Sequence, residues 1–181
     1  MLSLRLRTPR LVLNPLAESD ANLIGEALRD PALYRYLPQP IPADAADVRA
    51  LVARWAGGSR DPDLLWMNWI GVETATLGRV GLFQATIEPS QRTARIGYII
   101  FSAFQRRGFG REGVGALVQA LEARADTDVI LADVSEANRA SRALISSLGF
   151  TEREHRPGAG RDGDRLCADI VYARDHREKR G

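Results

Sequence analysis

A basic, glycine-containing segment at residues 105–111 has the composition of an anion site. It reads Gln-Arg-Arg-Gly-Phe-Gly-Arg and joins an expected strand to an expected helix. Glycine lets the backbone approach a ligand closely, and the first turn of a helix presents unpaired N–H groups with a partial positive charge. Arginines at that end disfavour the helix unless an anion joins them, so the segment predicts a phosphate site. A glycine turn with solvated arginines, in a chain rich in arginine, is the alternative.

Two polar residues, Asn138 and Ser141, open a second expected helix further along the chain. Their separation of three places them on one helix face, one turn apart. Asn138 suits the N-cap, and the Ser141 hydroxyl either faces the same cleft or bonds to its own helix backbone. Gly149 suits the left-handed position that ends the helix, with Phe150 folding back onto the last turn.

These segments resemble, in order and spacing, the GNAT superfamily of N-acetyltransferases. Residues 105–110 match its Q/R-x-x-G-x-G/A motif, and residues 138–150 resemble its N-x-x-A/S … L-G-F segment. Further segments are similar to the branch that contains the ribosomal-protein alanine acetyltransferases RimJ and RimL: Leu6–Leu11, Tyr34–Pro38, Ile96-Gly97-Tyr98 and Glu112. The resemblance covers about residues 6–174. Members of that branch acetylate protein N-termini, small amines and antibiotics, so the branch leaves the acceptor open.

The resemblance implies that acetyl-CoA lies where two parallel strands, 94–101 and 128–134, splay apart. Its pyrophosphate would rest on the backbone of residues 107–111, where a side chain at Gly110 would intrude. Its pantetheine would pair with the free edge of the first strand, and Asn138 would bond a pantetheine amide or a nearby backbone group. The implied cofactor-binding residues are Ile99, Ile100, Phe101, Gln105, Arg106, Arg107, Gly108, Phe109, Gly110, Arg111, Asn138 and Ser141.

The resemblance also implies two catalytic contacts and no metal. The backbone N–H of Ile100 would stabilise the oxyanion, and the Ser141 hydroxyl would meet the CoA sulfur. Two positions depart from the family pattern. Ile145 stands where many members have a tyrosine acid, and Arg95 stands where a glutamate often occurs. Neither an acid nor a base is carried over from those positions.

The expected acceptor is the N-terminal α-amine of a protein or peptide, with a small-molecule amine as the alternative. An α-amine has a pKa near 7.7–8.0 and is partly neutral at pH 7, whereas that of lysine is near 10.4. A weak base is then sufficient, and Glu73, Glu88 and Glu136 are candidates because they lie near expected strand ends. Segments 34–42 and 157–164 are expected to wall the acceptor site. A non-catalytic acyl-CoA sensor is the alternative to an enzyme.

The elements that must position these residues follow from hydrophobic periodicity and turn signals. A short strand at 11–13 precedes a helix over 23–28, a brief helix starting with Asp30-Pro31, and a helix over 44–55. Three strands follow, at 65–73, 78–87 and 94–101. Next come a helix at 114–125, a strand at 128–134 and a helix at 138–148. A strand pair at 150–156 and 166–174 comes last, joined by a loop over 157–164. This order predicts an α+β fold whose mixed, mostly antiparallel sheet carries helices on both faces.

Composition sets the broad class of protein. With 181 residues, 45% of them hydrophobic and 27% charged, the chain suits one globular domain over 1–181, frayed from residue 174. Its single cysteine, Cys167, suits a half-buried strand position in a reducing cytoplasm, and its two histidines lack metal-ligand spacing. A net charge of +2 argues against nucleic acid, and no apolar run is long enough for a membrane span. We expect a monomer or a homodimer.

Overall fold

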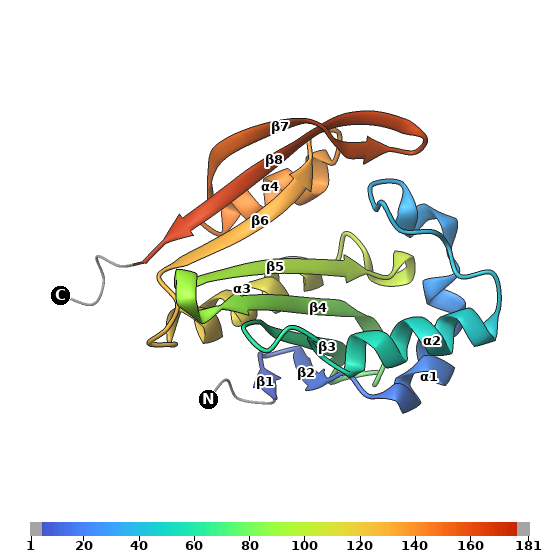
Figure 1. The fold of residues 1–181 in the computed structure, drawn as a ribbon. Helices are drawn as coiled ribbons and strands as arrows, with labels where there is room; N and C mark the ends of the chain where they lie inside the picture. Colours follow the sequence, from blue (N-terminus) through green and yellow to red (C-terminus); the bar gives the residue numbers. More distant parts are fainter. Residues whose placement is uncertain (1–4, 177–181) are drawn as a thin grey trace.

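The computed structural model describes residues 5–176 and folds them around one eight-stranded sheet (Figure 1). The strand order is β1-β2-β3-β4-β5-β6-β8-β7, and every neighbouring pair is antiparallel except β5–β6. The strands are β1 (Leu6–Arg7), β2 (Leu11–Pro15), β3 (Leu65–Glu73), β4 (Arg79–Glu88), β5 (Thr93–Ile100), β6 (Val129–Ser135), β7 (Thr151–Asp162) and β8 (Arg165–Asp175). The predicted mixed, mostly antiparallel sheet is confirmed.

Helices cover both faces of this sheet, as predicted (Figure 1). Within residues 5–176 they are α1 (Ala21–Leu28), α2 (Ala45–Ala56), α3 (Phe109–Glu122) and α4 (Arg139–Ser147), with short 3-10 turns η1 (Glu18–Asp20), η2 (Pro31–Tyr34), η3 (Pro89–Gln91) and η4 (Ser102–Phe104). Apolar residues of α3 and α4 share one core with Ala94 and Ile96 of β5. Residues of α1 and α2 share a second core with Ile99. None of the helices in this part of the chain combines the length and apolar character that a bilayer crossing requires.

The polar residues at helix starts act as caps. The Asp44 carboxylate accepts the N–H groups of Ala46 and Asp47 at the start of α2. Asn138 Oδ1 accepts the N–H of Ser141 at 3.1 Å, so the cap predicted for α4 is confirmed. At the other end of α4, Gly149 has φ of 80° and Phe150 is buried, again as predicted.

The C-terminal hairpin differs from the sequence-based prediction. Segment 157–164 forms no long loop, because β7 and β8 pair through Gly160↔Cys167 to Asp162↔Arg165 and turn over Gly163. The register shift between Arg156 and Gly160 absorbs the proline and glycine that suggested a loop. Strand β8 also continues through Asp175, so a frayed tail does not begin at residue 174; residues 177–181 lie outside the described part of the chain.

The parallel pair is short. Strands β5 and β6 are paired from Thr93↔Val129 to Ile96↔Ala132. Beyond Ala132, β6 continues to pair with β8 up to Ser135↔Asp169 and diverges from β5 (Figure 1). Residues 97–100 of β5 therefore keep β4 on one side and have no paired strand on the other.

Candidate active site

The unpaired side of β5 presents the backbone of alternate residues. The N–H of Phe101 donates to the Val80 carbonyl of β4 at 2.9 Å, so the backbone of Phe101 faces β4. Because alternate strand residues turn their backbone groups to opposite sides, Ile99 also faces β4, whereas Tyr98 and Ile100 face the unpaired side. The predicted free edge is thus wrong for Ile99 and Phe101. At Ile100 only the N–H is left without a partner strand, because the carbonyl accepts from Gln105 Nε2 at 2.9 Å.

Ser141 meets a partner that the sequence did not reveal. Its Oγ lies 2.6 Å from the hydroxyl of Tyr98, which reaches it from β5. Burial raises the pKa of Tyr98 to about 12, although the Ser141 hydrogen bond opposes this. The motif that contains Tyr98 was visible in the sequence, and strand alternation puts Tyr98 and Ile100 on the same face of β5. No sequence signal linked either residue to Ser141.

The basic segment forms the predicted turn before α3. Arg106 has φ of 60° and Gly108 has φ of 84°, and Gly108 is the N-cap of the helix. Phe109 is buried and anchors the first helical turn in the core. The exposed side chains of Arg106 and Arg111 flank that turn. A hollow of about 550 Å³ lies beside it, lined in part by Gly108, Arg111 and Leu148.

Gly110 has a packing role that the sequence did not predict. It lies within α3, and a Cβ at this position would lie 2.8 Å from Leu144 Cδ1 of α4 and 3.4 Å from Ile100 Cγ1. The missing side chain therefore lets α3 approach α4 and β5. A larger residue at 110 would therefore displace the end of the Leu144 side chain and crowd Ile100.

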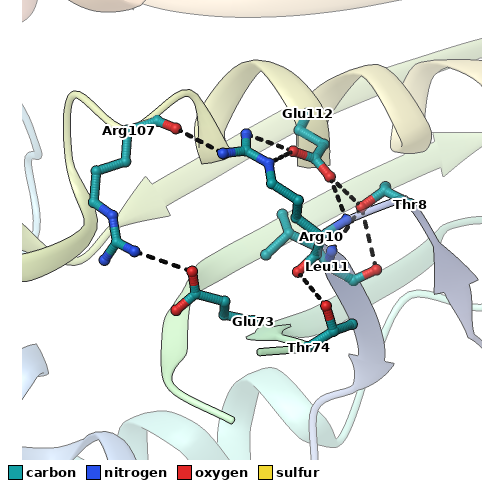
Figure 2. A network of polar contacts seen from close by, with 7 residues as sticks. All are labelled: Thr8, Arg10, Leu11, Glu73, Thr74, Arg107 and Glu112. Carbon is teal, nitrogen blue, oxygen red and sulfur yellow. Dashed lines mark hydrogen bonds and ion pairs between the residues drawn. The ribbon is translucent and has the colours of Figure 1, made fainter. Parts of the chain in front are cut away.

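An ion-pair network fastens the N-terminal strand to α3 (Figure 2). Glu112 accepts hydrogen bonds from the Thr8 hydroxyl at 2.6 Å and from the Arg10 backbone N–H at 2.9 Å. Its other oxygen accepts Arg10 Nε at 2.7 Å. Burial opposes ionisation, but these hydrogen bonds outweigh it and lower the pKa of the Glu112 carboxyl. The Arg10 guanidinium also donates to the Arg107 carbonyl at 3.2 Å, so the network holds the turn before α3 as well.

The side chain of Arg107 binds to other residues of the protein. Its guanidinium donates to Glu73 Oε1 at 3.0 Å (Figure 2). It also lies over the rings of Phe104 and Phe109, 5.3 and 4.9 Å from their centroids. Of the three arginines expected to serve an anion, this one stabilises the turn instead. Its partner Glu73 is buried and also accepts from Thr76, which makes it a structural ion-pair partner and a poor base.

The other two candidate bases, Glu88 and Glu136, lie at strand ends. Glu88 pairs with Thr93 at the opposite end of β5, and Glu136 is exposed beyond the end of β6. The structure instead places two aspartates, Asp133 and Asp169, on the sheet face opposite α3 and α4. Asp133 pairs with Arg95 across the β5–β6 junction, and burial, with the nearby Asp133, raises the pKa of Asp169. Residues 5–176 contain no group of three or more His, Cys, Asp or Glu side chains that could hold a metal.

Segments 34–42 and 157–164, which were expected to line the acceptor site, contact each other. Arg35 Nε pairs with Asp162 Oδ1 at 2.7 Å, and the Arg35 carbonyl accepts the Gly163 N–H at 2.7 Å. We call these two contacts the clasp. A hydrogen bond from Ser102 to Asp30 links the end of β5 to the start of η2, the turn that precedes Arg35. The clasp therefore joins the β7–β8 tip, through η2, to the end of β5.

Comparisons with known proteins agree with this geometry. Residues 10–151 match the family model described as an acetyltransferase (GNAT) domain. The fold is similar to RimL, a ribosomal L7/L12 α-N-protein acetyltransferase solved with coenzyme A (TM-score 0.80, 20% identity, 94% of this chain and 97% of that chain).

Two further structures are similar. One is the Salmonella typhimurium enzyme that modifies the N-terminal serine of L7/L12 (TM-score 0.80, 21% identity, coverage 93% and 96%). The other is spermidine N-acetyltransferase from Vibrio cholerae, in complex with CoA and spermine (TM-score 0.78, 17% identity, coverage 93% and 96%). The resemblance to the RimL branch is confirmed at the level of fold. With most of its length matched by the family model, the chain belongs to the GNAT family of acetyltransferases and is an acyltransferase.

Proposed function

We propose that this protein transfers the acetyl group of acetyl-CoA directly to the N-terminal α-amine of a protein or peptide. The observation that carries the proposal is the N–H of Ile100. It faces the unpaired side of β5, at the strand end that leads through the turn into the N-terminus of α3. A donor for an oxyanion and a site for phosphates thus lie on one continuous stretch of chain.

The residues around this stretch fit the parts of acetyl-CoA. The first-turn N–H groups of α3, with Arg106 and Arg111, suit the pyrophosphate. The backbone of Tyr98, which faces the side of β5 without a paired strand, suits an amide of pantetheine, since this amide would pair as a strand does. The 550 Å³ hollow beside Gly108 suits the adenosine end. Asn138 already caps α4, so a contact to the cofactor would come from its side-chain amide nitrogen.

The chemistry then needs little from the protein. As the amine nitrogen attacks, the N–C bond forms and the carbonyl oxygen becomes an oxyanion, which the Ile100 N–H stabilises. The C–S bond then breaks, the sulfur departs with the electron pair, and the Ser141 hydroxyl hydrogen-bonds to it. The amine proton passes to water. A thiol pKa near 8.5 makes the thiolate a tolerable leaving group without a strong acid.

The α-amine is the acceptor that this site suits best. Glu73 is held by Arg107, and Glu88 lies at the opposite end of β5 from Ile100, so neither is placed to take a proton from a lysine ammonium. An amine with a pKa near 8 needs no strong base. Two similar structures act on protein N-termini, which supports the proposal, and a third acts on spermidine.

The test is an acceptor panel assayed by release of free thiol from acetyl-CoA. It contains peptides with a free N-terminus, the same peptides with a blocked N-terminus and an internal lysine, and polyamines. We expect turnover with the free N-terminus and at least tenfold lower kcat/KM for the blocked peptides. Faster turnover of polyamines would establish a small-amine acetyltransferase. CoA binding by calorimetry without turnover of any amine would indicate an acyl-CoA sensor.

A further inference from the structure

We infer that Tyr98 fixes the direction of the Ser141 hydroxyl, so that the Ser141 proton points toward the departing sulfur of CoA. The inference rests on the proposed acetyl transfer and adds a residue to it. The two hydroxyl oxygens are 2.6 Å apart, which is a short, well-formed hydrogen bond between β5 and α4. Tyr98 is therefore a positioning residue that acts through Ser141.

The direction of this hydrogen bond decides what Ser141 can do. Each hydroxyl has one proton to donate. If Ser141 donated to Tyr98, its proton would be occupied and the sulfur would meet only lone pairs. A phenol is a stronger donor and a weaker acceptor than an alcohol, so the pair favours Tyr98 as donor. Burial supports this, because a Tyr98 pKa of about 12 keeps the phenol protonated at any ordinary working pH.

The same comparison of acidities shows that no proton is transferred. A thiolate whose conjugate thiol has a pKa near 8.5 does not remove a proton from a phenol with a pKa of about 12. The hydrogen-bond chain from Tyr98 through Ser141 therefore stabilises the thiolate while the C–S bond breaks. Both hydroxyls keep their protons throughout. The sulfur leaves as the thiolate and is protonated later by solvent.

The fold fixes both residues of this hydrogen-bond chain, Ser141 and Tyr98. The Ser141 backbone is fixed because its N–H bonds to Asn138 Oδ1 at the start of α4. Tyr98 stands two residues before Ile100 on β5, so their Cα atoms are separated by about 6–7 Å along the strand. One short piece of β5 thus carries the donor for the oxyanion and the residue that orients the donor for the sulfur. The atoms that these two donors serve, the carbonyl oxygen and the sulfur, are the two atoms of the thioester that gain negative charge during the reaction.

The test compares Tyr98→Phe, Ser141→Ala and the double variant with the wild type. Tyr172→Phe is the matched control, since it also removes a buried hydroxyl that contacts α4, through Arg142. We measure kcat and the KM for acetyl-CoA with the best acceptor of the panel. A second measurement needs no acceptor: the thiol of bound CoA is titrated by its thiolate absorbance.

We expect Tyr98→Phe and Ser141→Ala each to lower kcat by about three- to tenfold, with the KM for acetyl-CoA unchanged. The double variant should equal the single ones, and Tyr172→Phe should match wild type within twofold. The bound CoA thiol should titrate about half a pKa unit to one unit higher in Tyr98→Phe than in wild type.

Other results would overturn the inference. Additive losses in the double variant, or an unchanged thiol titration in Tyr98→Phe, would show that Tyr98 is structural. A thiol shift in a protein that acetylates no amine would keep the Tyr98 assignment and reject the proposed function. Acetyl transfer together with an unchanged thiol pKa in Tyr98→Phe would support the proposed function and reject the role assigned to Tyr98.

Discussion

The N–H of Ile100 is the group on which the proposed chemistry depends most, and proline removes it. We expect Ile100→Pro to lower kcat by about 10²- to 10³-fold, the usual effect of losing one oxyanion donor. Because this N–H faces the unpaired side of β5, its loss should break no hydrogen bond of the sheet. The measurement is thiol release at saturating acetyl-CoA, with thermal melts of the same samples.

Ile100→Val is the matched control, because it keeps the N–H and removes one methylene from the partly buried side chain. It should retain kcat within about threefold. Equal losses in the two variants would mean that the side chain, and not the N–H, carries the effect.

At the scale of residues, local chemistry could be predicted from the sequence and long-range partners could not. The Asn138 cap, the Gly149 helix end and the glycine turn depend on neighbours within a few positions, so spacing was sufficient. The contacts of Ser141 with Tyr98 and of Arg107 with Glu73 join positions 43 and 34 residues apart. They depend on which strand and helix come together, which no single segment encodes.

At the scale of elements, α3 packs onto β4 through a glycine. A Cβ at Gly113 would lie 2.3 Å from Phe83 Cζ, and Phe83 is fully buried. A Cβ at Gly115, on the same helix, would come no closer than 3.6 Å to Leu148. We expect Gly113→Ala to destabilise the protein by about 1–3 kcal/mol through overpacking. Gly115→Ala should stabilise it by up to about 1 kcal/mol through helix propensity.

The measurement for this pair is denaturant unfolding followed by circular dichroism. The two variants differ from wild type by the same methyl group in the same helix. If both substitutions raised the free energy of unfolding equally, helix propensity alone would account for the change. The contact of α3 with Phe83 would then be loose.

The attachment of the N-terminal strand to α3 should depend on pH. The pKa of Glu112 is lowered in the folded protein, so its contribution to stability is present above its ordinary pKa of about 4.5 and is lost as the pH falls through the folded value. We expect Glu112→Gln to cost about 1–2 kcal/mol at pH 7, reduced from the full charge-assisted value because Arg10 is half exposed.

As the pH falls below 4.5, the difference in unfolding free energy between wild type and Glu112→Gln should shrink, and it should vanish once the pH is below the lowered pKa of Glu112, as measured by urea titrations at several pH values. A difference that stays constant from pH 7 to pH 3 would show that the charge of Glu112 contributes nothing.

Elements were predicted well where periodicity was strong and less well where glycine and proline interrupted it. Helices α2 and α4 and the meander β3–β5 were found with errors of at most one residue at their ends, whereas α3 begins at Phe109 and not at 114, and ends at Glu122 and not at 125. Strand β7 was cut short at Arg156, because Pro157-Gly158-Ala159-Gly160 has the composition of a loop. Its true extent comes from β8, whose partner residues continue the ladder to Asp162.

At the scale of the whole molecule, the clasp ties together segments more than 120 residues apart in the sequence. Arg35 is largely exposed and Asp162 is about one-third exposed, so solvent screens the ion pair and it should add little to global stability. We expect Asp162→Ala to leave the melting temperature near that of wild type and to change the KM for the acceptor several-fold. The KM for acetyl-CoA should stay the same, because the turn before α3 is not involved.

The charge-swapped double variant Arg35→Asp with Asp162→Arg is the control. It should bring the acceptor KM back toward the wild-type value, because the pair is restored with opposite polarity. Unchanged acceptor kinetics in all these variants would mean that the clasp lies off the acceptor route.

The divergence of β5 and β6 has a consequence for what can reach the thioester. The two strands are joined at one end by four ladder pairs, and the path from β5 through Ser102, Asp30 and the clasp to β8 closes the other end. These contacts therefore form a closed ring of chain around the diverging strands. If the proposed transfer takes place inside this ring, an acceptor has to enter it end-first. We then expect a free chain terminus to be accepted more readily than a lysine on a folded surface, whose neighbouring residues would collide with the ring.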